Sequence, residues 1–160
     1  MIGRLTNQWT IASGSSCTNS PSGSFYALRS ILSYDAAGRI TNEQQCTPNN
    51  CTSGSGPTVS YGYDLAGNNT SLTNSVGAVN GLRQTMPLVL TTGFDGATHT
   101  SSLTSNWTSF SPNLFTIAPT NGYAAFGGPA NWSLGPSLSV AQSYMNRLWV
   151  NNITATGQVR

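Results

Sequence analysis

The fold of this chain is decided by an eight-residue stretch, Tyr34-Asp-Ala-Ala-Gly-Arg-Ile-Thr41. An aromatic residue ends an alternating segment, and the Asp after it is placed to accept hydrogen bonds from the next backbone N–H groups in an Asx-type turn. Gly38 supplies the positive φ that a tight turn needs. Arg39 and apolar Ile40 begin a return strand, with the Arg placed to reach a neighbouring Asp. The stretch predicts a β-hairpin whose tip is fixed by side-chain chemistry.

The same eight-residue frame recurs along the chain. Its positions are aromatic (1), Asp (2), Gly (5), Arg (6), apolar (7) and Thr (8). Ungapped copies are Tyr63-Asp-Leu-Ala-Gly-Asn-Asn-Thr70 and Phe94-Asp-Gly-Ala-Thr-His-Thr-Ser101, so the three frames start 29 and 31 residues apart. The repeat motif thus comprises Tyr34, Asp35, Gly38, Arg39, Tyr63, Asp64, Gly67, Phe94 and Asp95. Half a frame, Gly3-Arg-Leu-Thr6, opens the chain. A worn copy without the Asp and two residues shorter, Ser143-Tyr-Met-Asn-Arg-Leu148, is expected near the end.

Outward from these frames, apolar and polar residues alternate with period two, which is typical of strands. The alternating segments are 5–11, 26–34, 59–63 and 88–94, and stretches rich in Gly, Pro, Asn and Ser separate them. We therefore predict an all-β fold, an array of antiparallel hairpins in one region spanning residues 1–160. An irregular long-loop insertion is expected at 109–135. Strands near 3–11 and 147–153 should be the two edges of the array.

Charge excludes several kinds of partner. Only 6% of the residues are charged, and the net charge of +2 comes from Arg residues scattered along the chain. A nucleic-acid or anionic-membrane binder would carry a basic cluster, so neither partner is expected. No apolar run approaches the ~20 residues that cross a bilayer. The first residues, MIGRLTNQWT, lack the apolar core of a signal peptide.

The acidic residues argue against catalysis. Asp35, Asp64 and Asp95 occupy position 2 of their frames, whereas paired catalytic carboxylates should converge on one site. Glu43 lies outside the pattern, and we expect it to be exposed and without a role. His99 is the sole His and occupies position 6, and no strained turn presents a Ser beside it. We predict no catalytic residue and no cofactor.

The cysteines leave two alternatives open. Cys46 and Cys51 could close a small loop as a disulfide and leave Cys17 unpaired, or all three could be free thiols. A metal site would need His or further Cys partners that the sequence does not place nearby, so no metal is predicted.

The frame closely resembles the YD repeat of the Rhs family, which includes bacterial polymorphic toxins, the shells of insecticidal toxin complexes and the teneurins. Residues 34–41 match it completely, 63–70 have Asn68 for Arg, and 94–101 keep only the aromatic residue and Asp95. The resemblance runs from Gly3 to about Leu148. It implies hairpins that form a curved sheet ribbon, which coils into a hollow shell. Such a shell encloses a toxin in the bacterial proteins and serves adhesion in the teneurins. The chain is then expected to be a fragment starting and stopping inside repeats.

The resemblance implies a non-enzymatic structural segment of a large secreted or cell-surface protein. Its partners would be the remainder of the parent shell or the enclosed toxin domain. A rival hypothesis is a carbohydrate-binding adhesin module that stacks sugars on exposed aromatic residues, for which Trp9, Trp107, Trp132 and Trp149 are candidates. Cross-strand packing is the more usual role of such residues in a β protein.

Overall fold

A computed structural model describes residues 3–11, 25–46, 56–75, 78–79, 82–83, 87–106 and 112–157. The chain divides into two compact units. The first comprises Met1–Gly62 and Ser71–Leu88, and the second comprises Tyr63–Thr70 and Val89–Arg160. Cys17, Cys51 and Trp107 lie outside the described residues.

The described residues form strands joined by turns and contain no helix, so none that could cross a membrane. The strands are β1 (Asn7–Ile11), β2 (Phe25–Tyr34), β3 (Ile40–Cys46), β4 (Thr58–Tyr63), β5 (Asn69–Asn74), β6 (Ala78–Val79), β7 (Leu82–Arg83), β8 (Leu88–Phe94), β9 (Thr100–Ser105), β10 (Asn113–Ile117), β11 (Asn131–Leu134), β12 (Leu138–Tyr144) and β13 (Val150–Gly157). β6 and β7 pair by themselves. The other strands follow one another in an open antiparallel meander of 11 strands, from β1 to β13. The expected all-β hairpin array is confirmed.

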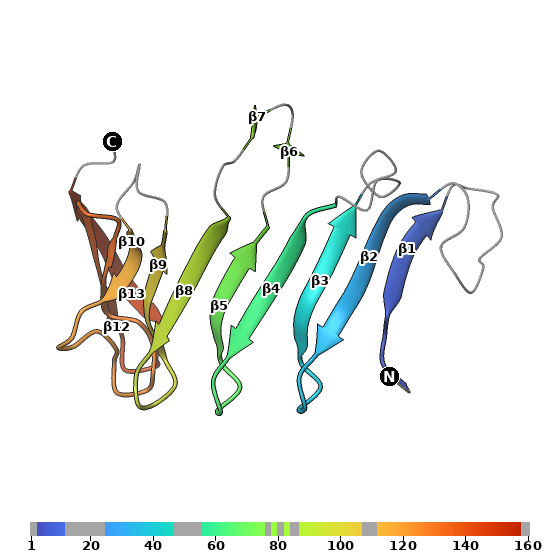
Figure 1. Ribbon diagram of the computed structural model, residues 1–160. Helices are drawn as coiled ribbons and strands as arrows, with labels where there is room; N and C mark the ends of the chain where they lie inside the picture. The colour runs from blue at the N-terminus through green and yellow to red at the C-terminus, as the bar shows by residue number, and fades with distance from the viewer. Residues whose placement is uncertain are drawn as a thin grey trace. The chain divides into compact units, whose positions relative to one another are not determined.

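In the first unit, β1, β2 and β3 pair because each strand follows the last through a turn or loop. Trp9 lies opposite Leu28, and Leu28 lies opposite Cys46 on the next strand. The hairpin of β2 and β3 closes with Tyr34 opposite Ile40, which are positions 1 and 7 of the frame. Figure 1 shows this turn at the same end of the strands as the chain's N-terminus.

In the second unit, β10, β11 and β12 align apolar residues across the sheet. Ile117 lies opposite Trp132, and Trp132 lies opposite Val140. Range 109–135 therefore differs from the irregular insertion that we expected, because it contains β10, β11 and an ordered turn. The sequence hides this turn, since Ala124 stands where the three frames at 34–41, 63–70 and 94–101 have Asp.

Full burial is rare in both units. The buried apolar residues among those described are Ile31, Cys46, Ile117 and Val140. Most strand residues are half-buried on both faces of the sheet, which suits the Thr, Ser and Asn that fill these strands. Stability therefore depends on strand pairing and on side-chain contacts near the turns more than on a deep core.

Candidate functional site

The first complete frame turn has the geometry that its sequence predicts. The N–H of Asp35 donates to the carbonyl of Arg39 at 2.9 Å, and the N–H of Gly38 donates to the carbonyl of Asp35 at 3.0 Å. Asp35 Oδ1 accepts from the N–H of Arg39 at 2.9 Å, and Oδ2 accepts from Arg39 Nε at 2.6 Å. Gly38 has a φ of 89°. The carboxylate therefore caps the turn and pairs with the Arg of its own frame.

The second frame repeats this arrangement with Asn in place of Arg. Asp64 accepts from the N–H and from the side-chain amide of Asn68, both at 2.8 Å. Gly67 has a φ of 95°. An amide at position 6 therefore preserves the side-chain hydrogen bond but not the ion pair.

The third frame keeps the cap although its Gly and Arg are gone. Asp95 Oδ1 accepts from the N–H groups of Ala97 and His99 at 2.9 Å, and Oδ2 lies 3.2 Å from His99 Nδ1. Thr98 occupies the Gly position with a φ of 65°, a conformation that a β-branched residue rarely adopts. The aspartate cap therefore holds a turn that contains a poorly suited residue.

These hydrogen bonds favour the ionised carboxylates. The backbone N–H of Arg39 lowers the pKa of Asp35, and the N–H of His99 lowers the pKa of Asp95. The side-chain amide of Asn68 lowers the pKa of Asp64. Each carboxylate is therefore engaged within its own turn.

One further frame turn escaped the sequence analysis, and another was placed with different bounds. From Tyr123, the N–H of Ala124 donates to the Gly128 carbonyl and the N–H of Gly127 donates to the Ala124 carbonyl, both at 2.8 Å. Gly127 has a φ of 87°. Tyr123 starts 29 residues after Phe94 and has Gly at position 5, and this spacing was the available signal.

The last frame also differs from the expected worn copy at 143–148. The N–H of Met145 donates to the Trp149 carbonyl at 2.9 Å, and the N–H of Leu148 donates to the Met145 carbonyl at 2.8 Å. Tyr144 lies opposite Val150, as positions 1 and 7 do elsewhere. The frame therefore has its full eight residues, 144–151. Leu148, with a φ of 65°, stands in the Gly position, so neither Asp nor Gly marks it in the sequence.

Three pairs of successive frames contact one another through what we call a clasp. A clasp has two parts: a side chain of one frame packs on the position 1 ring of the next, and the hydroxyl of that ring donates to the position 7 carbonyl of the first frame. In the first unit, the Arg4 guanidinium carbon lies 5.2 Å from the centre of the Tyr34 ring. The Tyr34 hydroxyl donates to the Leu5 carbonyl. Leu5 is position 7 of the opening half-frame.

The second unit contains the same clasp with a different side chain. His99 packs on Tyr123 with 4.6 Å between ring centres, and the Tyr123 hydroxyl donates to the carbonyl of Thr100. The Gly position of the next frame makes room for the packed side chain. A Cβ at Gly127 would lie 3.3 Å from His99 Nε2, and one at Gly38 would lie 2.9 Å from Arg4 Nη2.

A third clasp joins the frames at Tyr123 and Tyr144. Position 6 here is Gly128, and Phe126 from position 4 packs edge-on against Tyr144 with 4.8 Å between ring centres. The Tyr144 hydroxyl donates to the Pro129 carbonyl at 2.7 Å. A Cβ at Gly128 would lie 2.8 Å from that hydroxyl. Different side chains therefore meet the same requirement, a ring covered on one side and a hydroxyl bonded to the previous frame.

Glu43 is the main correction within the first unit. We expected an exposed residue, but its side chain is only 2% exposed. Arg29 Nε donates to its Oε2 at 2.7 Å, and Tyr61 and Gln45 donate to its Oε1 at 3.0 and 3.1 Å. Burial raises the pKa of Glu43, but the hydrogen bonds from these three residues and the Arg29 charge outweigh burial and hold it below its usual value. The cluster ties β2, β3 and β4 together.

Cys46 forms a disulfide. Its partner lies outside the described residues, so the pairing with Cys51 stays a prediction. Among the described residues no group of three His, Cys, Asp or Glu side chains could hold a metal ion.

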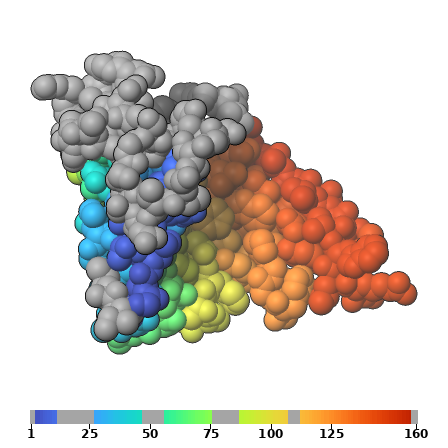
Figure 2. Space-filling model, turned by 90° about the vertical axis from the view of Figure 1, so that its right-hand side faces the viewer, coloured from blue at the N-terminus to red at the C-terminus, as the bar shows by residue number. Residues whose placement is uncertain are grey.

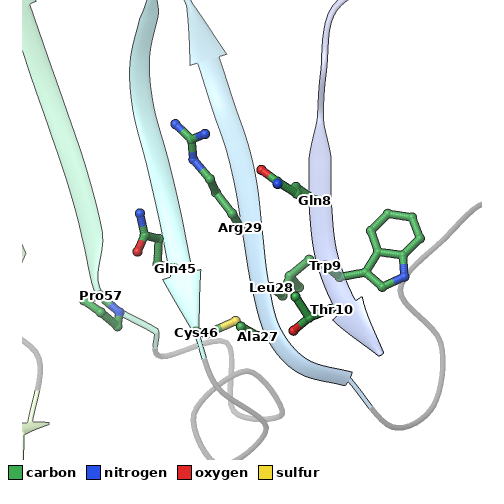
Figure 3. Close-up of a pocket in the computed structure, with 9 residues that line it drawn as sticks. All are labelled: Gln8, Trp9, Thr10, Ala27, Leu28, Arg29, Gln45, Cys46 and Pro57. Atoms are coloured by element: carbon green, nitrogen blue, oxygen red, sulfur yellow. The ribbon is translucent and has the colours of Figure 1, made fainter. Parts of the chain in front are cut away.

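A hollow of about 460 Å³ lies beside Cys46 at the far end of β1, β2 and β3 from the frame turns (Figure 3). This volume is within the range of small-molecule sites. Figure 3 shows the Trp9 ring directed away from Arg29 and Gln45, so these polar groups and the ring do not converge. Trp132 is half-buried within the sheet, whereas Trp149 is 73% exposed.

No protein-family model matches this chain, and no curated protein matches it.

Proposed function

We propose that this chain is a non-enzymatic structural segment of a large Rhs/YD-repeat protein that is secreted or displayed at the cell surface. It would contribute hairpins to a curved β-shell that encloses a toxin, or to a surface stalk. Its partners would then be the rest of the shell or the enclosed toxin domain. The carrying observation is the recurrence of one turn, with the same main-chain hydrogen bonds, at Tyr34, Tyr63, Phe94, Tyr123 and Tyr144.

The chemistry of the repeated residues supports this role. Asp35, Asp64 and Asp95 cap their own turns, and Arg4 and His99 pack on the next frame. Side chains that bond within a turn or pack on the next repeat stabilise the array of repeats, because the stability of a repeat protein comes from each repeat and from its contacts with its nearest neighbours. The Cys46 disulfide suits an oxidising compartment outside the cytosol.

The coding sequence on both sides of this chain tests the proposal. We expect further aromatic-Asp-x-x-Gly frames at spacings near 30 residues in both directions. Unrelated sequence on both sides would contradict the proposal.

A second candidate function is carbohydrate binding by an adhesin module, and the high exposure of Trp149 favours it. A glycan array on the purified chain tests this candidate. Micromolar binding to a defined glycan that is lost in Trp149→Ala and kept in Leu65→Ala would support it, since Leu65 is also fully exposed but lies on a different turn. Absence of binding on the array would exclude the glycans tested.

A further inference from the structure

The last frame presents half of a clasp. At position 6, Trp149 is 73% exposed, and at position 7, Val150 is 48% exposed. Within the described residues no ring packs on Trp149 and no tyrosine hydroxyl donates to the Val150 carbonyl. At the two preceding clasps of the same unit, the equivalent carbonyls of Thr100 and Pro129 accept from Tyr123 and Tyr144. The occupied clasps therefore indicate what would complete the last one.

The strand that follows is an edge. β13 pairs with β12 on one side, and it is the last strand of the sheet order. All of its residues are exposed, including Ile153 at 58%. It carries neither charge nor Pro, the features by which natural edge strands resist pairing. In Figure 2 the last strands of the second unit, coloured orange to red, are open to view.

The topology specifies the direction of an added strand. β9 is a return strand that follows a frame, and its outer neighbour β10 runs antiparallel to it and leads on to Tyr123. β13 is also a return strand, so a strand added beside it in the same way would run antiparallel and lead into an aromatic residue. A head-to-tail second copy would offer β1, which is itself a return strand and would lie parallel to β13. A second copy therefore does not supply the missing group.

We propose that the edge formed by β13, Trp149 and Val150 binds an antiparallel strand that ends in the tyrosine of a further Tyr-Asp-x-x-Gly hairpin. The tyrosine ring packs on Trp149, and its hydroxyl donates to the Val150 carbonyl. Strand addition supplies main-chain hydrogen bonds, and the tyrosine supplies specificity. This inference rests on the proposed structural role, and it adds the partner's chemistry and the residues that receive it.

The test titrates the full chain into a dye-labelled synthetic peptide with the sequence of residues 58–75, which carries Tyr63, Asp64 and Gly67 and has no Cys or Trp. Fluorescence anisotropy should show saturable binding. A Tyr63→Phe peptide should bind about 3- to 10-fold more weakly, because one hydrogen bond is lost. Trp149→Ala in the chain should weaken binding about 10-fold or more. Trp149→His should largely retain it, since His99 fills this position in another frame.

Leu65→Ala in the chain is the matched control, because it removes an exposed apolar side chain from another turn, and it should leave binding unchanged. Absence of peptide binding would overturn the proposal. Equal binding of a Tyr63→Ala peptide would mean unspecific strand addition and would overturn it too. The chain could instead dimerise in a way that Trp149→Ala abolishes and that the peptide does not inhibit. That result would make a second copy the occupant of the edge and would overturn the proposal. The structural role fails on a different observation, the absence of frames in the flanking coding sequence, so the two failures are distinguishable.

Discussion

The Glu43 cluster gives an asymmetric prediction, because its two charged members differ in exposure. The Arg29 side chain is 37% exposed, whereas Glu43 is 2% exposed. Removing the carboxylate leaves a cation that water can solvate. Removing the cation leaves a buried anion, to which Tyr61 and Gln45 are the remaining donors among the described residues. We therefore expect Arg29→Met to destabilise the protein more than Glu43→Gln.

The magnitudes follow from these exposures. Glu43→Gln loses charged hydrogen bonds but keeps an amide oxygen that can accept from Tyr61, so it should cost about 1–2 kcal/mol in the free energy of unfolding. Arg29→Met leaves a buried charge unpaired, and such changes cost about 3–5 kcal/mol. The two remaining donors place our expectation near the lower end, about 3 kcal/mol.

Acidification should reverse part of this difference. In the native protein the lowered pKa of Glu43 means that its contribution is present above its ordinary pKa and is lost as the pH falls through the lower folded value. Without Arg29 the carboxylate loses the hydrogen bonds and the charge that Arg29 supplies, so we expect protonation at low pH to relieve the unpaired buried charge. The stability deficit of Arg29→Met should therefore shrink between pH 7 and pH 4.

Urea unfolding at both pH values measures these free energies, followed by tryptophan fluorescence and far-UV circular dichroism, which must give coincident transitions. An Arg29→Met variant within about 1 kcal/mol of the native protein at pH 7 would refute the reasoning. So would a Glu43→Gln variant that is less stable than Arg29→Met.

Three further predictions concern the frame turns. Thr98→Gly should raise the melting temperature, because Gly removes the cost of a φ of 65° at a β-branched residue, whereas Gly38→Ala should lower it; thermal melts followed by circular dichroism compare them. The free energy of unfolding should decline as the pH falls below about 4, because the lowered pKa values of Asp35, Asp64 and Asp95 make their caps depend on ionisation. A free energy of urea unfolding that stays constant from about pH 6 to about pH 2.5 would contradict this. Burial and the Asp95 charge raise the pKa of Tyr123, so its neutral form stabilises the fold below pH about 10 and this contribution is lost as the pH rises further. In urea unfolding, Tyr123→Phe should cost about 1 kcal/mol at pH 7 and should reduce the loss of stability at high pH.

The sequence predicts the frames that carry Asp, because an Asx-type cap requires a particular side chain at a particular place. It does not reveal the turn at Tyr123, and it gives the turn at Tyr144 only as a shortened copy at 143–148, because Ala124 and Met145 replace the Asp. Their geometry is set by main-chain hydrogen bonds and by clasps with neighbouring frames, which leave little trace in local residue type. Leu148 even adopts the positive φ without Gly.

The clasps could not be predicted from one sequence. Arg4, His99 and Phe126 have little in common chemically, and what they share is that each packs on the tyrosine ring of the next frame. The burial of Glu43 was missed for a related reason, since its partners come from β2 and β4 as well as from its own strand. Contacts across strands depend on register. The order of hairpins alone predicts which strands lie at the edges, and β1 and β13 do, although β13 spans Val150–Gly157 and not 147–153.

The central claim is that Asp at position 2 of a frame caps a structural turn, and adding the Asp to a frame that lacks it tests the claim most directly. Ala124→Asp places a carboxylate where Asp35, Asp64 and Asp95 accept the N–H of position 6, which here belongs to Gly128. By analogy with helix caps the gain should be about 1 kcal/mol, or about 2–4 °C in melting temperature. Ala125→Asp adds the same charge one residue later and should give no gain. A rise for Ala124→Asp alone is the predicted result, whereas an unchanged or lower melting temperature for Ala124→Asp would contradict the account.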